Sequence, residues 1–268
     1  MPHIFATAQR HRFLFSELVK RDFKKKYKRT YLGMLWSLLS PLLTLFVMNF
    51  VFSHMFGRNG GDYDYVIYLF CGIIVWSFFS DATSGGMLSL ISNAGIFSKV
   101  NVPKYLFLFS KNVSSLINFF LTFVVFLVFC LLRRVPITPL FFALAVPILC
   151  LIVFNLGVGM ILSALYIFFR DAQYLWSVFL TLLLYLTAIF YDPYQLGGVI
   201  GENTWLFLFN PVFVYVKYFR CLVLGVNGAP PTLPSWRFSL LAVGYSVAAF
   251  LCGAWIYKRQ NHKFLYYI

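Results

Sequence analysis

The residues that could do chemistry are few, and their spacing favours binding over catalysis. Asp81, Asp171 and Asp192 lie far apart and form no Asp-x-Asp pair, the acidic cluster that a metal-dependent glycosyltransferase would need. The 4 histidines are scattered, and the 5 cysteines include no Cys-x-x-Cys. No Gly-x-x-x-x-Gly-Lys-Ser/Thr motif occurs, so the chain carries no P-loop for ATP. The sequence therefore predicts no catalytic residue, no metal site and no cofactor in this chain, and cysteines that fill apolar positions.

A run of bases near the amino terminus could bind an anionic ligand. It includes Lys24, Lys25, Lys28 and Arg29. Apolar residues recur at three- and four-residue steps over 15–31, largely on other faces, which predicts an amphipathic helix in the membrane interface. Each base near an anionic surface contributes on the order of 1 kcal/mol. Two interpretations stay open: a stop signal that fixes the orientation in the membrane, or a platform for the phosphates of a lipid-linked cargo.

Aromatic residues are abundant, with 33 Phe, 17 Tyr and 6 Trp. Aromatic rings can stack on the C–H faces of sugars without strict hydrogen-bond geometry, which would suit a polymer that must bind and keep sliding. The alternative is that Phe faces lipid, while Trp and Tyr form the belt at the membrane–water interface. The aromatics that matter for this choice recur in two apolar stretches and include Trp36, Phe46, Phe50, Tyr174, Phe179 and Tyr185.

Six long apolar stretches must position these side chains. Each has about the 20 residues that a helix needs to cross the ~30 Å hydrocarbon layer. With 61% hydrophobic and 11% charged residues, the chain has too little polar surface for a soluble globule. The sequence predicts an all-α integral membrane protein, with an interface helix at 1–31 and a six-span transmembrane domain at 32–268. The stretches are 32–56, 65–91, 106–132, 139–168, 173–191 and 238–257.

The distribution of bases predicts the orientation. If the spans alternate and the amino terminus is cytoplasmic, 16 of the 22 Lys and Arg fall on the inner side and 6 on the outer side, namely Arg58, Arg133, Arg134, Lys217, Arg220 and Arg237. The positive-inside rule then places both termini in the cytoplasm. We attribute the net charge of +14 to bases that fix the topology and contact anionic lipids. Nucleic-acid binding is excluded, because the bases flank spans and form no separate domain.

Two connections are unusual. In 192–224, neither apolar piece is long enough to cross, and Asn210-Pro211 is a good helix start, which predicts a re-entrant helical hairpin on the outer side between the fifth and sixth spans. The alternative, one distorted span, would put the basic carboxyl terminus outside. The short basic loop 92–104, with Pro103 before the next helix, is either a plain connection or a small helix that docks on a soluble partner.

Several of these elements together carry a family resemblance. The chain resembles the membrane subunit of ABC exporters for polysaccharides and polyol phosphates, such as O-antigen, capsule and teichoic-acid exporters. The matching elements are the basic amphipathic start that leads into Tyr27-Lys28-Arg29-Thr30-Tyr31-Leu32-Gly33-Met34-Leu35-Trp36-Ser37 and Pro41, then Phe169-Arg170-Asp171, then Asn210-Pro211. The likeness covers nearly the whole chain.

The resemblance implies a homodimer in the bacterial cytoplasmic (inner) membrane, paired with two copies of an ABC ATPase subunit that binds ATP and Mg²⁺. It implies an undecaprenyl-linked glycan or polyol-phosphate polymer as the substrate, in a channel at the dimer interface lined by the first and fifth spans. The aromatics Trp36, Phe46, Phe50, Tyr174, Phe179 and Tyr185 then become channel candidates. By the same analogy the 92–104 loop is a coupling helix for the ATPase, with contacts from Lys99, Val100, Asn101, Pro103, Lys104, Arg170 and Asp171.

Two other functions stay open at this stage. A drug or lipid efflux permease of the same superfamily would share the architecture without needing aromatic rings along the pore. A membrane-embedded transferase acting on lipid-linked sugars is a less favoured alternative, because Asp81, Asp171 and Asp192 form no acidic site.

Overall fold

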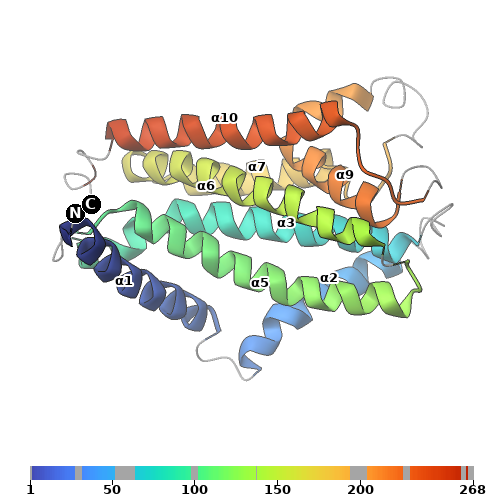
Figure 1. Cartoon of the computed structure of the whole chain (residues 1–268), viewed down its shortest axis with the longest axis horizontal. Coiled ribbons are helices and arrows are strands. Elements are labelled where there is room, and N and C mark those ends of the chain that lie inside the picture. The colour runs from blue at the N-terminus through green and yellow to red at the C-terminus, as the bar shows by residue number, and fades with distance from the viewer. Residues whose placement is uncertain are drawn as a thin grey trace.

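The computed structural model is built from helices throughout the part of the chain that it describes, which is residues 2–27, 32–51, 64–97, 102–136, 138–193, 204–225, 230–260 and 264. Figure 1 shows them as an elongated bundle. The α-helices are α1 (Pro2–Tyr27), α2 (Trp36–Phe50), α3 (Tyr65–Leu88), α4 (Ala94–Phe97), α5 (Tyr105–Leu132), α6 (Ala145–Phe168), α7 (Ala172–Leu186), α9 (Pro211–Val223) and α10 (Trp236–Gln260). Short 3-10 helices are η1 (Gly33–Leu35), η3 (Ile91–Asn93), η4 (Pro139–Leu144) and η5 (Thr204–Phe209).

Four helices are long and apolar enough to cross a bilayer. They are α3, α5, the continuous η4–α6 segment and α10, with 24, 28, 30 and 25 residues. At 1.5 Å per residue each exceeds the ~30 Å hydrocarbon layer. The short connections 133–138 and 169–171 make α5, α6 and α7 successive antiparallel neighbours. The protein is therefore an all-helical integral membrane protein, as predicted.

Helix α3 forms the centre of the bundle. Its residues from Tyr65 to Val75 are all buried, and it packs against α2, α5, α6, α7 and α9. Phe70 meets Phe126 of α5 edge to face, with 5.5 Å between the ring centroids. A helix that is apolar on all sides is expected to lie inside a bundle rather than on its surface. Helices α2 and α7 thus flank the same central helix.

Helices α6 and α10 approach each other most closely. A Cβ on Gly157 would clash with the backbone at Ala249, and a Cβ on Gly253 would clash with the backbone at Gly157. Small residues let helix backbones touch in membranes, where van der Waals contact replaces the hydrophobic effect as the driving force. These two glycines therefore fix α10 against α6.

Helices α2 and α7 are shorter than the predicted first and fifth spans. Each has 15 residues, against the stretches 32–56 and 173–191 inferred from hydropathy. Fifteen residues rise about 22 Å, which is less than the ~30 Å hydrocarbon layer. The helix α7 ends at Leu186, and Ala188 then has a φ of 50°. The chain after Leu186 stays buried without remaining helical, a departure from the prediction that is explained below.

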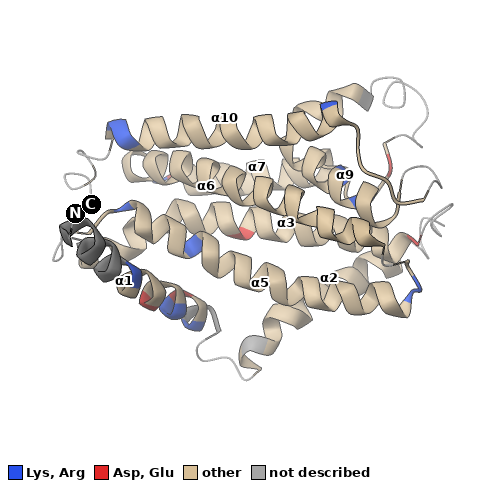
Figure 2. Ribbon diagram, in the orientation of Figure 1, with Lys and Arg blue, Asp and Glu red and all other residues tan. Residues whose placement is uncertain are grey.

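The amino-terminal helix α1 packs on the bundle through its apolar side. Leu18 is buried against Phe107 of α5, with Leu14, Ala94 and Ile96 around it. The start of α1 and the end of α10 lie at the same end of the molecule, and Figure 2 shows the charges of α1 and of the end of α10 at this end. Helix α1 includes residues 15–27 of the predicted amphipathic helix, whose residues 28–31 lie outside the described residues, and part of its apolar face covers protein.

Helix α9 begins where the sequence predicts. The Asn210 side chain accepts hydrogen bonds from the backbone N–H groups of Val212 (3.0 Å) and Phe213 (3.4 Å), and Pro211 occupies the first turn. Nearly all of α9 is buried, so it belongs to the core rather than to an exposed loop. The preceding residues 194–203, which include much of the predicted hairpin, lie outside the described residues.

Candidate functional site

The aromatic candidates on α2 lie on one uncovered face. Trp36, Phe46 and Phe50 are 41%, 69% and 53% exposed, together with Leu43 and Val47. Leu43 follows Trp36 by seven residues, and Phe46, Val47 and Phe50 follow Leu43 by three, four and seven residues, so all five lie on the same side of a helix. The structure thus directs the three aromatic side chains away from the core of their own chain.

The candidates on α7 are also uncovered. Tyr174, Phe179 and Tyr185 are 71%, 46% and 60% exposed, and within this helix only Ala172 is buried. Because α2 and α7 flank α3, the six candidates lie on two helices that share a central neighbour. In the described part of this one chain, most of the surface of α7 has no protein partner, so lipid or a second copy must cover it.

An apolar cavity of about 780 Å³ lies beside α7. Its walls come from α3, α6, α7, η5 and the start of α9, and from Tyr191. Phe179 lines it, whereas the other five candidates do not. The volume lies within the roughly 300–1,000 Å³ of ligand pockets, and the wall has few polar groups, so it suits an apolar group or an aromatic contact.

Trp176 is a cavity residue that was not among the six candidates. Its ring lies 5.4 Å from that of Phe179 and 6.2 Å from that of Phe79. The buried indole Nε1 has no hydrogen-bond partner among the described residues. The sequence signal was present, since Trp176 precedes Phe179 by three residues and shares its helix face.

The predicted phosphate contacts are only partly described. Lys24 is an exposed residue of α1, and Lys25 belongs to the same helix, but its side chain lies outside the described residues, as do Lys28 and Arg29. The role of these four bases therefore stays a prediction.

The predicted coupling residues lie on two connections. Lys99, Val100 and Asn101 are outside the described residues. Lys104, at the start of α5 and next to Pro103, lies 5.5 Å from the centroid of the Phe264 ring. Partial burial lowers the pKa of the Lys104 ammonium below its usual value.

Arg170 and Asp171 lie on the second connection, between α6 and α7. Both are exposed, and Arg170 lies over the ring of Tyr166 at 5.4 Å. The backbone carbonyl of Asp171 accepts from the N–H groups of Tyr174 and Leu175, so this residue begins α7. Their solvent-facing position at the end of a helix is compatible with contact to another protein.

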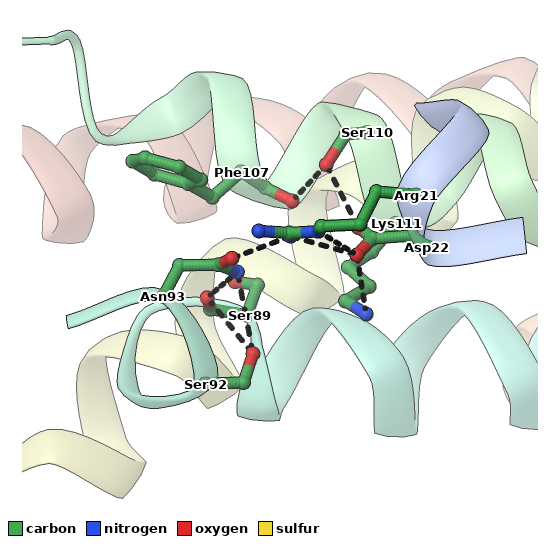
Figure 3. Close-up of polar contacts among 8 residues, drawn as sticks. All are labelled: Arg21, Asp22, Ser89, Ser92, Asn93, Phe107, Ser110 and Lys111. Atoms are coloured by element: carbon green, nitrogen blue, oxygen red, sulfur yellow. Dashed lines mark hydrogen bonds and ion pairs between the residues drawn. The ribbon is translucent and has the colours of Figure 1, made fainter. Parts of the chain in front are cut away.

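A buried charge cluster joins α1 to this region, and Figure 3 shows it. Asp22 of α1 is 5% exposed. Its carboxylate lies 2.7 Å from Arg21 Nη2 and 3.3 Å from Lys111 Nζ, and it accepts a hydrogen bond from the Ser110 hydroxyl at 3.2 Å. Arg21 Nη2 also donates to Asn93 Oδ1 at 2.5 Å. One carboxylate thus connects α1 to α5 and, through Arg21, to η3.

The sequence did not predict this cluster, because the prediction for this helix rested on its Lys and Arg residues and not on Asp22. Asp22 follows the buried Leu18 by four residues, so both lie on the side of α1 that packs against α5. An acid on the apolar face of a basic helix was the available signal. Asn93 ends η3 directly before α4, and the predicted coupling loop 92–104 therefore contacts α1 through this residue.

Comparisons with known proteins agree on one family. The family of ABC-2 type transporters matches residues 14–224. The chain is similar to an O-antigen export system permease protein RfbA of Klebsiella pneumoniae, with 29% identity over 219 residues that cover 79% of this chain and 82% of the relative. It is also similar to a protein of the same name from Myxococcus xanthus, with 30% identity over 183 residues that cover 68% and 69% of the two chains.

Proposed function

We propose that this chain, which belongs to the family of ABC-2 type transporters, is the membrane subunit of an ABC exporter for a lipid-linked polysaccharide. The observation that carries the proposal is the similarity to O-antigen export permeases over 79% of the chain. The aromatic side chains of α2 and α7 support it, since 41–71% of the surface of each candidate ring residue is exposed and can contact a sugar chain.

The proposed topology has six crossings with both termini in the cytoplasm of a bacterial cell. Helices α2, α3, α5, α6, α7 and α10 are the six spans, and η5 with α9 forms a re-entrant piece on the outer side. The end of the molecule that carries α1 and Lys258-Arg259 faces inward by the positive-inside rule. The short helices α2 and α7 cross together with the residues that adjoin them.

The proposed channel lies between two copies of the chain. A homodimer that brings the uncovered faces of α2 and α7 together would place Trp36, Phe46, Phe50, Tyr174, Phe179 and Tyr185 around the polymer. Stacking on sugar faces gives attraction without a fixed register, so the chain can slide. The cationic face of α1, with Lys24, Lys25, Lys28 and Arg29, would hold the pyrophosphate of an undecaprenyl-linked substrate.

The energy source of the proposed exporter is a separate ATPase subunit, present in two copies, which binds ATP and Mg²⁺. The sequence contains no P-loop, so the ATPase stroke must enter through surface contacts. Those contacts are the 92–104 loop, with Lys99, Val100, Asn101, Pro103 and Lys104, and the exposed Arg170-Asp171 pair. The Asp22 cluster would pass movement of this loop to α1, because Arg21 Nη2 donates hydrogen bonds both to Asn93 at the loop and to Asp22.

The test is reconstitution of the permease with its ATPase subunit in lipid vesicles. We expect a lipid-linked glycan to stimulate ATP hydrolysis, and the permease alone to hydrolyse no ATP. Stimulation by phospholipids or hydrophobic drugs, with none by the glycan, would favour an efflux permease instead. Transfer of sugar to a lipid carrier by the permease alone would favour the transferase.

A further inference from the structure

The five residues that follow α7 have an irregular backbone, and the first four of them are buried. Thr187, Ala188 and Ile189 are fully buried and Phe190 is 6% exposed, although α7 ends at Leu186 and Ala188 has a φ of 50°. Irregular backbone at membrane depth is tolerated only where protein groups satisfy its N–H and C=O groups. The question is therefore which groups satisfy the carbonyls of this segment.

Side chains from α3 and α9 bond four consecutive carbonyls of the segment. Arg220 donates to the carbonyls of Ala188 (3.0 Å, from Nη1) and Ile189 (2.8 Å, from Nη2). Two tyrosine hydroxyls of α3 complete the set: Tyr65 donates to the Phe190 carbonyl at 2.9 Å and Tyr68 to the Tyr191 carbonyl at 2.7 Å. We call Arg220, Tyr65 and Tyr68 the outer clamp.

Arg220 is held in place by more than these bonds. It is 7% exposed, its guanidinium lies 3.4 Å from the centroid of the Tyr68 ring, and its Nε donates to the Tyr68 carbonyl at 3.3 Å. A Cβ on Gly72 would lie 2.9 Å from Arg220 Nη2 and 2.8 Å from Ile189 Cγ2. Gly72 therefore provides the space into which the planar guanidinium fits, and a planar donor of several N–H groups suits several carbonyls at once.

Asn210 adds a link to the same segment. Its side-chain amide donates to Thr187 Oγ1 at 3.0 Å, while its carbonyl oxygen caps α9. The start of α9 is thereby tied to the end of α7. Asn210 and Tyr191 also line the apolar cavity, together with Leu186 at the end of the helix.

Helix α7 packs on the core along one side only. Four side chains are partly buried there, Trp176, Leu180, Leu183 and Leu184, and within the helix only Ala172 is fully buried, so its orientation also depends on what holds its two ends. The chain that continues from the carboxyl end of α7 is buried, and its carbonyls accept hydrogen bonds from the clamp. We infer that Arg220, Tyr65 and Tyr68 are positioning residues, which hold the end of α7 and the adjoining cavity wall in the arrangement that transport requires.

This inference rests on the proposed function, because α7 is taken to line the channel. It goes further by assigning transport roles to residues outside the proposed channel lining and the proposed ATPase contacts. The clamped segment meets α7 at Tyr185: the Tyr191 hydroxyl donates to the Tyr185 carbonyl at 2.8 Å, and the Phe190 ring lies 6.3 Å from the Tyr185 ring. The clamp is therefore expected to affect export through the position of that helix.

The experiment uses the permease–ATPase complex with a spin label at Leu186→Cys, in a Cys252→Ser background, because Cys252 is exposed and the other cysteines are buried. The test variants are Tyr68→Phe, which removes one hydroxyl and keeps the ring, and Arg220→Lys, which keeps the charge and loses the planar donor. The matched control is Lys217→Met, three residues earlier on α9, where Lys217 lies over the Phe238 ring at 5.4 Å.

We expect the label to become more mobile in both test variants and not in the control. Glycan-stimulated export should fall roughly tenfold, the scale of one lost buried hydrogen bond, while membrane abundance and ATP hydrolysis without glycan stay near wild type. Tyr68→Phe is the milder change and keeps the test valid if Arg220→Lys lowers abundance.

Two results would overturn the inference. Unchanged label mobility in both variants would show that the clamp does not hold α7, and increased mobility with full export would show that the held position is not needed for transport. Failure of the proposed function is distinguishable, because the wild-type complex would then export no glycan while the label would still report the clamp.

Discussion

Two buried charges lie at opposite ends of the bundle, and the protein stabilises them differently. Asp22, at the end with α1, is surrounded by the opposite charges of Arg21 and Lys111. Arg220, at the end with α9, is surrounded by neutral carbonyls and an aromatic ring. Arg21 is 39% exposed and connects the first cluster to solvent, whereas the second is enclosed.

The difference predicts how each end responds to change. Attraction between opposite charges acts over several ångströms and survives small movements, so the Asp22 cluster can stay intact while α1 and the coupling loop shift. Hydrogen bonds from a guanidinium to carbonyls depend on distance and angle and weaken steeply when either changes. The Asp22 end is therefore suited to transmit motion, and the Arg220 end is suited to hold one geometry.

The largest effect is expected for Arg220→Met. The change leaves the carbonyls of Ala188 and Ile189 without these donors in a buried setting, where each unsatisfied group costs about 1–3 kcal/mol, and it removes the additional bond to the Tyr68 carbonyl. We expect the free energy of unfolding in detergent to fall by about 3 kcal/mol or more, and by the same amount in low and high salt. If the variant and the wild type unfolded at the same midpoint denaturant concentration, the claim that Arg220 stabilises the segment after α7 would be contradicted.

A smaller effect is expected for Asp22→Asn. The change leaves Arg21 and Lys111 close together without their counter-charge, and partial exposure of both bases reduces the cost to about 2 kcal/mol. Because the remaining repulsion is between charges, salt should restore part of the stability, unlike in Arg220→Met. The measurement is the unfolding midpoint at two salt concentrations.

Glu17→Gln is the matched control for Asp22→Asn. Glu17 pairs with Lys20 at 2.8 Å on the exposed side of α1, and a surface pair contributes little. We expect no measurable change in stability and normal coupling of ATP hydrolysis to export. If Asp22→Asn were equally neutral, the cluster would have no structural role.

The uncovered aromatic faces give the third prediction. Trp36→Ala removes a stacking surface worth about 1–3 kcal/mol by analogy with aromatic platforms for bases. Export should fall while abundance and basal ATP hydrolysis stay normal, and Trp36→Phe should restore most of the export. Trp255→Ala on α10, where Trp255 is 63% exposed, is the control for an exposed ring outside the two proposed channel helices, and it should leave export unchanged.

The smallest effect is expected for Ser110→Ala. The change removes one hydroxyl that donates to Asp22, and the two basic partners of Asp22 remain. We expect a loss of about 1 kcal/mol in the free energy of unfolding. A loss as large as that of Asp22→Asn would mean that hydrogen bonding, rather than charge balance, holds the cluster together.

Hydropathy and local capping rules predicted much of the fold. The apolar stretches predicted the ends of α3, α5, the η4–α6 segment and α10 to within three residues, because a segment in lipid must satisfy its own backbone. Asn210-Pro211 predicted the start of α9, since the cap and the proline act within one turn. The prediction that cysteines fill apolar positions holds for Cys71, Cys130, Cys150 and Cys221, and Cys252 is exposed.

Features that depend on distant residues were not predicted. The end of α7 at Leu186 is stabilised by Arg220, 34 positions later, and by Tyr65 and Tyr68, so the uninterrupted apolar stretch to Tyr191 looked like helix. Arg220 itself was counted among the outer bases, although it is buried. The channel candidates predicted from the sequence do lie on exposed faces of α2 and α7. The sequence could not predict the cavity beside α7, because α3, α6, η5 and α9 form the rest of its wall.

The most direct test of the central claim is photo-crosslinking during export. A benzophenone side chain replaces Phe46 on α2 or Tyr185 on α7, and replaces Phe142, which is 87% exposed in η4, as the lipid-facing control. With the ATPase subunit, ATP and a labelled lipid-linked glycan, the account predicts sugar adducts at positions 46 and 185 and only lipid adducts at 142. Lipid adducts alone at all three positions, in a complex that exports the glycan, would contradict the claim that the faces of α2 and α7 line the path of the polymer.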